Sequence, residues 1–217
     1  MSFWEYVRSD WNEILSLVLA HIRLSGVSIL FAILLAVPAG ILLTRHEKAA
    51  KPVLTAVGIV QTIPGLVLLG IGLMLFGLGD VPSVIVLVVY AVLPILQNTY
   101  TGIREVDDLY VEAARGIGMS DLQLLLRVEL PIALPALVAG IRLSTVYTIS
   151  WATLAALIGA GGLGDLIWTG LSTYNSNMIL AGAIPASLLA VAAGFLIDLF
   201  QRAATPRGLR GKGGGEQ

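Results

Sequence analysis

The sequence contains no cysteine among its 217 residues. Disulfides, thiolate catalysis and metal sites that need cysteine ligands are therefore excluded. Charged residues are scarce as well, at 12%, whereas an ordinary soluble domain carries about 25%. The net charge of −1 comes without the basic stripe that a nucleic-acid backbone requires. These shortages argue against a soluble domain and against a nucleic-acid partner.

Catalytic motifs are missing too. The sequence shows no paired carboxylates, no histidines at metal-ligand spacing and no nucleophile constellation, so we predict no catalytic residue, no metal and no cofactor. It contains no GxxxxGK[ST] loop, so we do not expect this chain to hydrolyse ATP. The stretch GAGGLG, Gly159–Gly164, matches a dinucleotide pattern but lacks the strand that must precede it. We interpret it as a flexible outer turn that contacts a binding protein or helps to gate.

Long apolar runs dominate what is present. Hydrophobic residues make up 57% of the chain, and their runs reach about 20 residues, which is the length needed to cross a bilayer. The sequence therefore predicts an all-α integral membrane protein, a bundle of about five transmembrane helices. We expect Pro64 and Pro185 to kink two of these helices. The predicted spans are Leu24–Leu43, Val53–Leu78, Pro82–Gln97, Ala136–Ala160 and Met178–Phe200.

The positions of lysine and arginine predict the orientation. Basic residues cluster in the connection at 44–52, in the segment 101–135 and in the tail, whereas the connections at 79–81 and 161–177 contain none. Because cytoplasmic loops carry the excess of basic residues, we expect a multi-pass protein with its N-terminus outside and its C-terminus in the cytoplasm. Arg8 and Arg23 count against this orientation.

The chain divides into three regions. Residues 1–20 place Trp4, Val7 and Trp11 at helical spacing, which is typical of an interfacial helix and equally of an extension of the first span. Residues 21–200 form the predicted transmembrane domain. Residues 201–217 are rich in glycine and polar groups, so we expect a disordered cytoplasmic tail.

The segment 101–135 predicts a cytoplasmic helix-turn-helix. Asp107 or Asp108 can cap a first helix, Gly118 can end it in a left-handed conformation, and Ser120 with Gln123 forms a capping box for a second helix. We expect Pro131 to end that second helix. Leu109, Ala113 and Ile117 fall on one face, which we expect to pack on the membrane helices. The opposite face presents Tyr110, Glu112, Arg115 and Met119.

This segment resembles the EAA loop of type I permeases of ATP-binding-cassette (ABC) importers. The matching residues are Glu112-Ala113-Ala114, Gly118 and Leu130-Pro131, while Val128 stands where isoleucine is commoner. The stretches VGIVQTIPGLVLLGIG, LPILQNTYTGI and SWATLAALIGAGGLGDLIWTGL are similar to the osmoprotectant branch, which transports glycine betaine, carnitine and choline. The resemblance covers residues 15–200 and implies a bacterial inner (cytoplasmic) membrane permease.

The resemblance also implies partners. A cytoplasmic ATPase would dock on the EAA segment, and two such ATPases would drive two permease subunits, identical or related, between inward-open and outward-open states. An extracytoplasmic binding protein would deliver the solute. The residues expected to couple the permease to its ATPase are Glu112, Ala113, Ala114 and Gly118, together with Tyr110, Arg115 and Met119.

Polar and aromatic side chains inside the predicted spans are candidates for the translocation path, because a quaternary ammonium ion is attracted to aromatic faces. Ordinary interhelical hydrogen bonding is the alternative for each of them. The candidates are Gln61, Thr62, Tyr90, Asn98, Tyr147, Ser150 and Trp151.

Two further polar side chains are expected at the membrane surfaces. We predict that Arg142 snorkels to the inner surface, or pairs with Glu129 or Asp198, and that His21 is interfacial.

Two other functions remain open at this point. Permeases for methionine, phosphonate or another small solute share the EAA pattern. A secondary transporter that works without ATP is the other alternative, but it would usually show inverted repeats or acids near the centre of a span. We find neither in the sequence.

Overall fold

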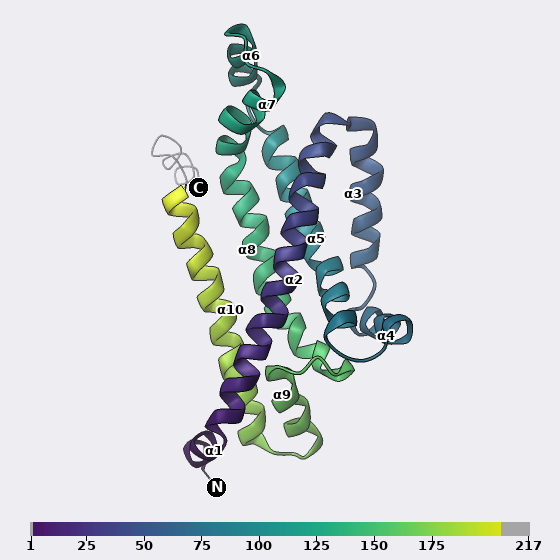
Figure 1. Ribbon diagram of the computed structural model, residues 1–217, viewed down its shortest axis with the longest axis vertical. Helices are drawn as coiled ribbons and strands as arrows, with labels where there is room; N and C mark the ends of the chain where they lie inside the picture. Colours follow the sequence, from purple (N-terminus) through teal and green to yellow (C-terminus); the bar gives the residue numbers. More distant parts are fainter. Residues whose placement is uncertain (1, 205–217) are drawn as a thin grey trace, which may run out of the picture.

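Residues 2–204 are described by a computed structural model, and within them the chain is helical and has no strand. Long helices run side by side along the long axis of the molecule, and a small helical segment projects at one end (Figure 1). The helices are α1 (Phe3–Ser9), α2 (Trp11–Arg45), α3 (Glu47–Gln61), α4 (Gly65–Phe76), α5 (Asp80–Arg104), α6 (Asp108–Gly116), α7 (Asp121–Leu124), the π-helix η1 (Leu125–Glu129), α8 (Leu130–Ala155), the 3₁₀ turn η2 (Ala156–Ile158), α9 (Leu163–Ser172) and α10 (Ser176–Ala204).

Four helical stretches in the described part are long and apolar enough to cross a membrane. They are 11–45, 80–104, 121–158 and 176–203. The broken pair α3–α4 makes a fifth if it counts as one span. The predicted bundle of about five transmembrane helices is confirmed in this sense.

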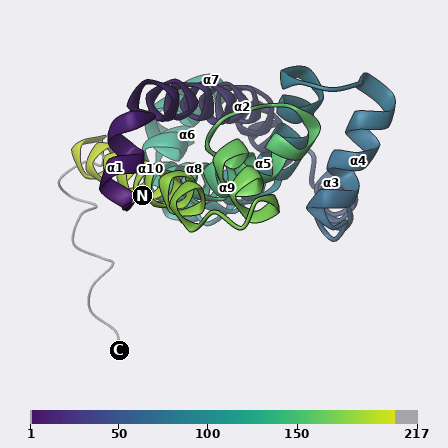
Figure 2. The same ribbon diagram turned by 90° about the horizontal axis from the view of Figure 1, so that it is seen from below.

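The second predicted span is broken rather than kinked. α3 and α4 meet at 92°, and the break lies at residues 62–64. Pro64 cannot donate to the preceding turn, and it sits as the N-cap of α4 with an extended ψ of 134°. Viewed from below, α3 and α4 lie together at one edge of the bundle (Figure 2). The prediction of one kinked helix over Val53–Leu78 is therefore wrong.

The first span is longer than predicted. α2 has 35 residues, which at 1.5 Å per residue is about 52 Å, well over the ~30 Å of a hydrocarbon core. Residues 11–20 therefore continue the first span, while α1 is a separate short helix capped by Ser2 and Glu5. The interfacial location of this region stays a prediction. At the other end of the chain, α10 includes residues 201–204 of the predicted tail, and residues 205–217 lie outside the described part.

Small side chains let the central helices α2, α5 and α8 approach closely. An added Cβ on Gly40 would lie 2.8 Å from Thr99 Cβ, and one on Gly140 would lie 2.6 Å from Asn98 Cβ. Such contacts supply packing where lipid removes the hydrophobic drive for association. Alanines of α2 and α5 are fully or nearly fully buried in the same interface, among them Ala32, Ala36 and Ala91.

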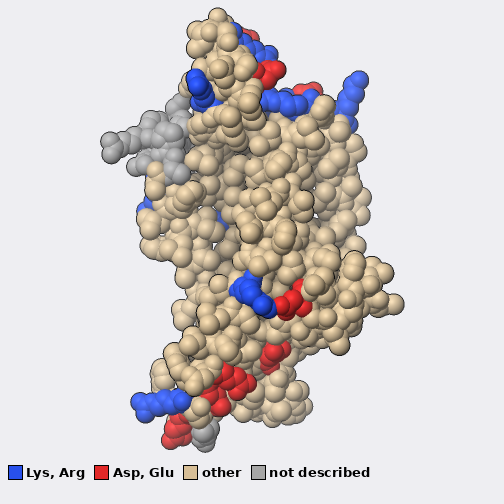
Figure 3. All heavy atoms as spheres, in the orientation of Figure 1, with Lys and Arg blue, Asp and Glu red and all other residues tan. Residues whose placement is uncertain are grey.

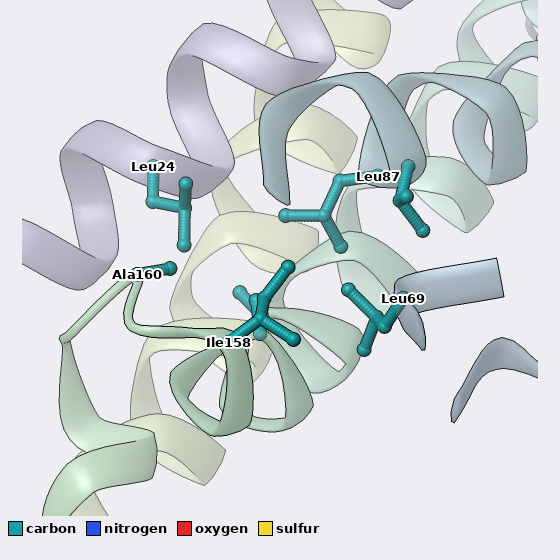
Figure 4. Close-up of a cluster of buried hydrophobic side chains, with 8 residues drawn as sticks. Leu24, Leu69, Leu87, Ile158 and Ala160 are labelled. Atoms are coloured by element: carbon teal, nitrogen blue, oxygen red, sulfur yellow. The ribbon is translucent and has the colours of Figure 1, made fainter. Parts of the chain in front are cut away.

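A second apolar cluster joins elements that are distant in sequence. Leu24 of α2, Leu69 of α4 and Leu87 of α5 converge on Ile158 and Ala160, which follow α8 (Figure 4). This cluster secures the broken pair α3–α4 against the bundle, because Leu69 is only 2% exposed.

Two polar side chains discussed above have partners within the bundle. Arg142 does not simply snorkel: its Nε lies 3.0 Å from Asp198 of α10, so the alternative of an ion pair with Asp198 holds. The interfacial location of His21 stays a prediction, but the imidazole faces the protein interior. Its side chain is fully buried, and its Nε2 lies 3.0 Å from the carbonyl oxygen of Ile149. α2 starts ten residues before His21, and the imidazole lies next to Gly162 of the glycine-rich turn.

Candidate functional site

The segment between α5 and α8 forms the predicted helix-turn-helix. The Asp107 carboxylate accepts a 2.9 Å hydrogen bond from the backbone N–H of Leu109 and so caps α6. Gly118 has a φ of +83°, which a glycine adopts without strain. Ser120 and Gln123 form the expected capping box at the start of α7. These local predictions are confirmed.

The second helix does not end at Pro131. α7 passes through the π-helix Leu125–Glu129 into α8, and Pro131 lies in the first turn of α8. Pro131 cannot donate a hydrogen bond to the preceding turn, and the π-helical geometry of that turn accommodates it. The coupling segment, which we define as 105–129, is therefore joined to a membrane span by continuous helix.

The expected packing face of α6 is wrong. Leu109 is 71% exposed and Ile117 is 77% exposed, and neither lies against the bundle. Ala114 is the buried residue of α6. The large apolar side chains of α6 are therefore exposed. The segment that carries them projects beyond the ends of the long helices (Figure 1).

The residues expected to couple to an ATPase lie around this outward surface. Glu112, Ala113, Arg115 and Gly118 are exposed, Tyr110 is 53% exposed and Met119 is partly buried. The Ala114 side chain is buried instead. Its backbone carbonyl accepts a 3.1 Å hydrogen bond from the N–H of Met119, which closes the turn after α6. Leu109 and Ile117 join the same surface, although the sequence analysis assigned them to the bundle.

A partly buried ion pair lies where this segment meets the bundle. The guanidinium of Arg45, the last residue of α2, donates two hydrogen bonds to the carboxylate of Glu129, one of them 3.0 Å long. The Glu129 side chain is 5% exposed. The sequence analysis considered Glu129 only as a partner of Arg142. Glu129 lies between Val128 and Leu130 at the start of an apolar span. A carboxylate in such a place is stabilised by a nearby cation, and this could have indicated an ion pair.

The candidates for a translocation path converge only in part. A pocket of about 300 Å³ opens between α3, α5 and α8. Four of the seven predicted residues line it: Gln61, Tyr90, Tyr147 and Trp151. Leu87, Ala91 and Thr148 complete the lining. They were not predicted, because leucine, alanine and threonine are common in membrane spans and carry no distinctive signal.

Hydrogen bonds and stacking hold the pocket together. The Tyr90 and Trp151 rings stack with centroids 4.9 Å apart and planes 11° apart. Gln61 Nε2 donates to the Tyr90 carbonyl at 2.7 Å, and the Tyr90 hydroxyl donates to the carbonyl of Ile63. The second bond satisfies a carbonyl freed by the α3–α4 break. The break and the pocket therefore form one structure.

Gly65, at the start of α4, allows the Trp151 ring to fit. A Cβ at this position would lie 1.6 Å from Trp151 Cζ3, well inside van der Waals contact. Any side chain here would displace the indole.

The other three candidates make local hydrogen bonds instead. The Thr62 hydroxyl donates to the Ile59 carbonyl, Asn98 Nδ2 to the Pro94 carbonyl and the Ser150 hydroxyl to the Val146 carbonyl, at 2.7, 2.8 and 3.1 Å. They do not line the pocket. Their bonds match the alternative of ordinary helix hydrogen bonding.

The glycine-rich turn after η2 is packed against the bundle. Gly159, Gly161 and Gly162 all have φ between +72° and +81°, a conformation that side chains disfavour. An added Cβ on Gly162 would lie 3.0 Å from His21 Nδ1. The glycines thus serve backbone geometry and close packing over His21.

Comparison with known proteins agrees with these features. Residues 26–209 match the family model described as "Binding-protein-dependent transport system inner membrane component". The chain is 43% identical over 206 residues to the glycine betaine/carnitine/choline transport system permease OpuCB of Bacillus subtilis, and 42% identical to the choline transport system permease OpuBB of the same organism. Each alignment covers 95% of both chains.

The fold has a solved counterpart. An inward-facing structure of the MetNI methionine ABC transporter aligns with a TM-score of 0.80 at 24% sequence identity, over 89% of this chain and 96% of the other. At this identity the likeness shows the fold alone, which is that of type I ABC importer permeases. Family and fold imply ATPase and substrate-binding partners and a transport role rather than catalysis. The chain therefore belongs to the family of inner membrane components of binding-protein-dependent transport systems, the permease subunits of ABC importers.

Proposed function

We propose that this permease imports quaternary ammonium osmoprotectants such as glycine betaine, carnitine and choline. The identity of 42–43% to permeases named for these solutes, over 95% of the chain, carries the proposal. The pocket supports it. Its lining has two tyrosines, a tryptophan, a glutamine and a threonine but no charged side chain. Aromatic faces attract a quaternary ammonium ion without the fixed charge that would trap it.

The translocation path includes this pocket. A volume of about 300 Å³ admits a small solute. Tyr147, 53% exposed, lies at the open side, while Tyr90 and Trp151 form the stacked wall. Thr62, Asn98 and Ser150, which lie outside the pocket, would meet the solute only in another conformation of the transport cycle.

The coupling segment receives the ATPase. Exposed apolar residues facing water mark an interaction surface, and Leu109, Tyr110 and Ile117 are all more than half exposed. Glu112 can form a charge-assisted hydrogen bond to the partner, Arg115 and Met119 flank the contact, and Gly118 sets the turn. Ala113 allows close approach, and Ala114 anchors the segment from within.

The assembly contains two permease subunits, identical or related, with two cytoplasmic ATPases and one extracytoplasmic binding protein. The chain lies in a bacterial inner membrane with its N-terminus outside and its C-terminus in the cytoplasm. Lysine and arginine gather at the end of the molecule that carries α6 and α7, whereas acidic residues dominate the opposite end around α1 (Figure 3). This separation supports the orientation.

Uptake by the reconstituted transporter tests the substrate. We expect ATP-dependent uptake of labelled glycine betaine or choline that excess carnitine reduces and excess methionine does not. Uptake of methionine in preference to betaine would contradict the substrate assignment, and uptake without ATP or an ATPase would contradict the transporter class.

Substitution of the coupling residues tests the docking. We expect the double variant Glu112→Ala, Gly118→Ala to lose uptake and substrate-stimulated ATP hydrolysis, because one change removes the carboxylate and the other strains a left-handed turn. Gly116→Ala is the control, since an added Cβ there meets nothing within 4 Å. Unchanged uptake in the double variant would refute the docking role.

A further inference from the structure

The Arg45–Glu129 pair connects the end of α2 to the π-helix η1, and few other contacts join these two elements. Arg45 ends α2, and Glu129 ends the π-helix between α7 and α8. A groove of about 390 Å³ lies between the same elements. Pro38, Ile41, Leu42 and Arg45 line one side, and Asp121, Leu122 and Leu125 line the other. Side chains do not fill this space, so the ion pair is a principal contact between α2 and the coupling segment.

The geometry of the pair is suited to transmitting force. A bidentate contact between guanidinium and carboxylate fixes orientation as well as distance. The carboxylate is 5% exposed, so solvent screens the pair little, whereas the Arg45 side chain is 37% exposed. The pair also sits at a π-helix, a feature that occurs most often at functional sites.

The two spans reach the coupling segment by different routes. α8 continues from α7 and η1 as helix, so a displacement of α6 and α7 moves α8 directly. α2 has no such continuity, because α3, the broken α4 and α5 separate it from the coupling segment in sequence. α2 packs on α5 and α8 within the bundle, and at its inner end Arg45 adds a direct contact with the coupling segment.

We propose that Arg45 and Glu129 are positioning residues that make α2 move with the coupling segment during transport. The pair stays closed throughout the cycle and acts as a strut. Breaking it leaves the ATPase docked and active but makes its stroke inefficient, because the inner end of α2 no longer follows the coupling segment directly. The inference depends on the proposed docking of an ATPase on α6.

The chain offers a matched control pair at the same end of the molecule. Arg104 at the end of α5 pairs with Glu47 at the start of α3 at 2.7 Å, and both side chains are about half or more exposed. This pair joins α5 to α3 and does not link α2 to the coupling segment. An exposed pair of this kind contributes little, so breaking it should leave transport unchanged.

The first experiment measures solute uptake per ATP hydrolysed in proteoliposomes containing the complete transporter. We expect Glu129→Gln, which keeps the shape of the side chain but removes its charge, to lower this ratio at least about tenfold while the ATPase still copurifies. Glu47→Gln should keep the wild-type ratio. A wild-type ratio for Glu129→Gln would overturn the proposal.

The second experiment uses the absence of cysteine from this chain. The double variant Arg45→Cys, Glu129→Cys is assembled with cysteine-free partners and treated with a short bis-methanethiosulfonate cross-linker, which reductant removes. We expect low uptake before treatment, recovered uptake after cross-linking and low uptake again after reduction. Arg104→Cys, Glu47→Cys should transport in all three states. Cross-linking that fails to restore uptake would contradict a permanent strut.

The outcomes separate this inference from the proposed function. If the wild-type permease does not bind the ATPase, the proposed function fails. If the wild type binds and transports, and Glu129→Gln does both equally well, the strut alone fails. Loss of ATPase binding in Glu129→Gln would show that the pair only supports the fold of the coupling segment, which also overturns the strut.

Discussion

The coupling segment and the aromatic pocket differ in how far this chain completes them. In the pocket, Gln61, Tyr90 and Trp151 are linked to one another or to backbone carbonyls, and Gly65 leaves room for the indole. In α6, one alanine is buried and the large apolar side chains face outward. The first region is organised within this chain, whereas the second leaves its large apolar side chains uncovered. Substitutions in the pocket should therefore affect folding, and those in α6 should affect binding.

The largest effect is expected at Gly65. Gly65→Ala places a Cβ 1.6 Å from Trp151 Cζ3, and such overpacking costs about 1–3 kcal/mol or more. We expect a lower unfolding temperature in detergent and loss of uptake. Gly58→Ala, in the same broken span, meets nothing within 4 Å and should leave both unchanged. Equal behaviour of the two variants would show that the pocket is not preorganised.

Tyr90→Phe should have the next largest effect. The variant keeps the stacking on Trp151 but leaves the Ile63 carbonyl without its donor, which costs about 1–3 kcal/mol when the group is buried. Thermal unfolding measures the loss. Tyr174→Phe is the control, because Tyr174 is 95% exposed. Wild-type stability of Tyr90→Phe would mean that this hydrogen bond does not hold the α3–α4 break.

The coupling segment should respond in the opposite way. We expect Leu109→Ser, Ile117→Ser to leave thermal stability unchanged, because both side chains are more than two-thirds exposed. ATPase affinity should fall about tenfold, which corresponds to about 1.4 kcal/mol. Leu78→Ser, 72% exposed at the opposite end, should not alter the affinity. A lower unfolding temperature with unchanged ATPase affinity would contradict this prediction.

The smallest effect is expected at the exposed pair Arg23–Asp80. Both side chains are about half or more exposed, and such pairs contribute about 0–1 kcal/mol. Arg23→Gln should therefore shift thermal unfolding little and leave uptake intact. A large loss of stability would show that this ion pair, rather than packing, holds α2 to the start of α5.

What the sequence could predict depends on whether the signal is local. The caps at Asp107 and Ser120 and the left-handed Gly118 follow from neighbouring residues, and the structure confirms them. The direction in which α6 faces depends on long-range contacts, so Leu109 and Ile117 were misplaced. The same holds for Pro131, which the π-helix accommodates, and for Arg45 and Glu129, which lie 84 positions apart.

The pocket shows a similar division. Polar and aromatic side chains within apolar spans identified Gln61, Tyr90, Tyr147 and Trp151, and the structure brings these four together. Thr62, Asn98 and Ser150 carry the same kind of signal but bond to carbonyls three or four residues earlier. Only helix packing distinguishes the two groups, as it does for the 92° break at Pro64.

Labelling of Ile117→Cys with a membrane-impermeant maleimide tests the central claim most directly, since the chain has no other cysteine. The account predicts no labelling in intact cells, labelling in inverted vesicles stripped of the ATPase, and protection when the ATPase is restored. Labelling in intact cells, or equal labelling with and without the ATPase, would contradict it.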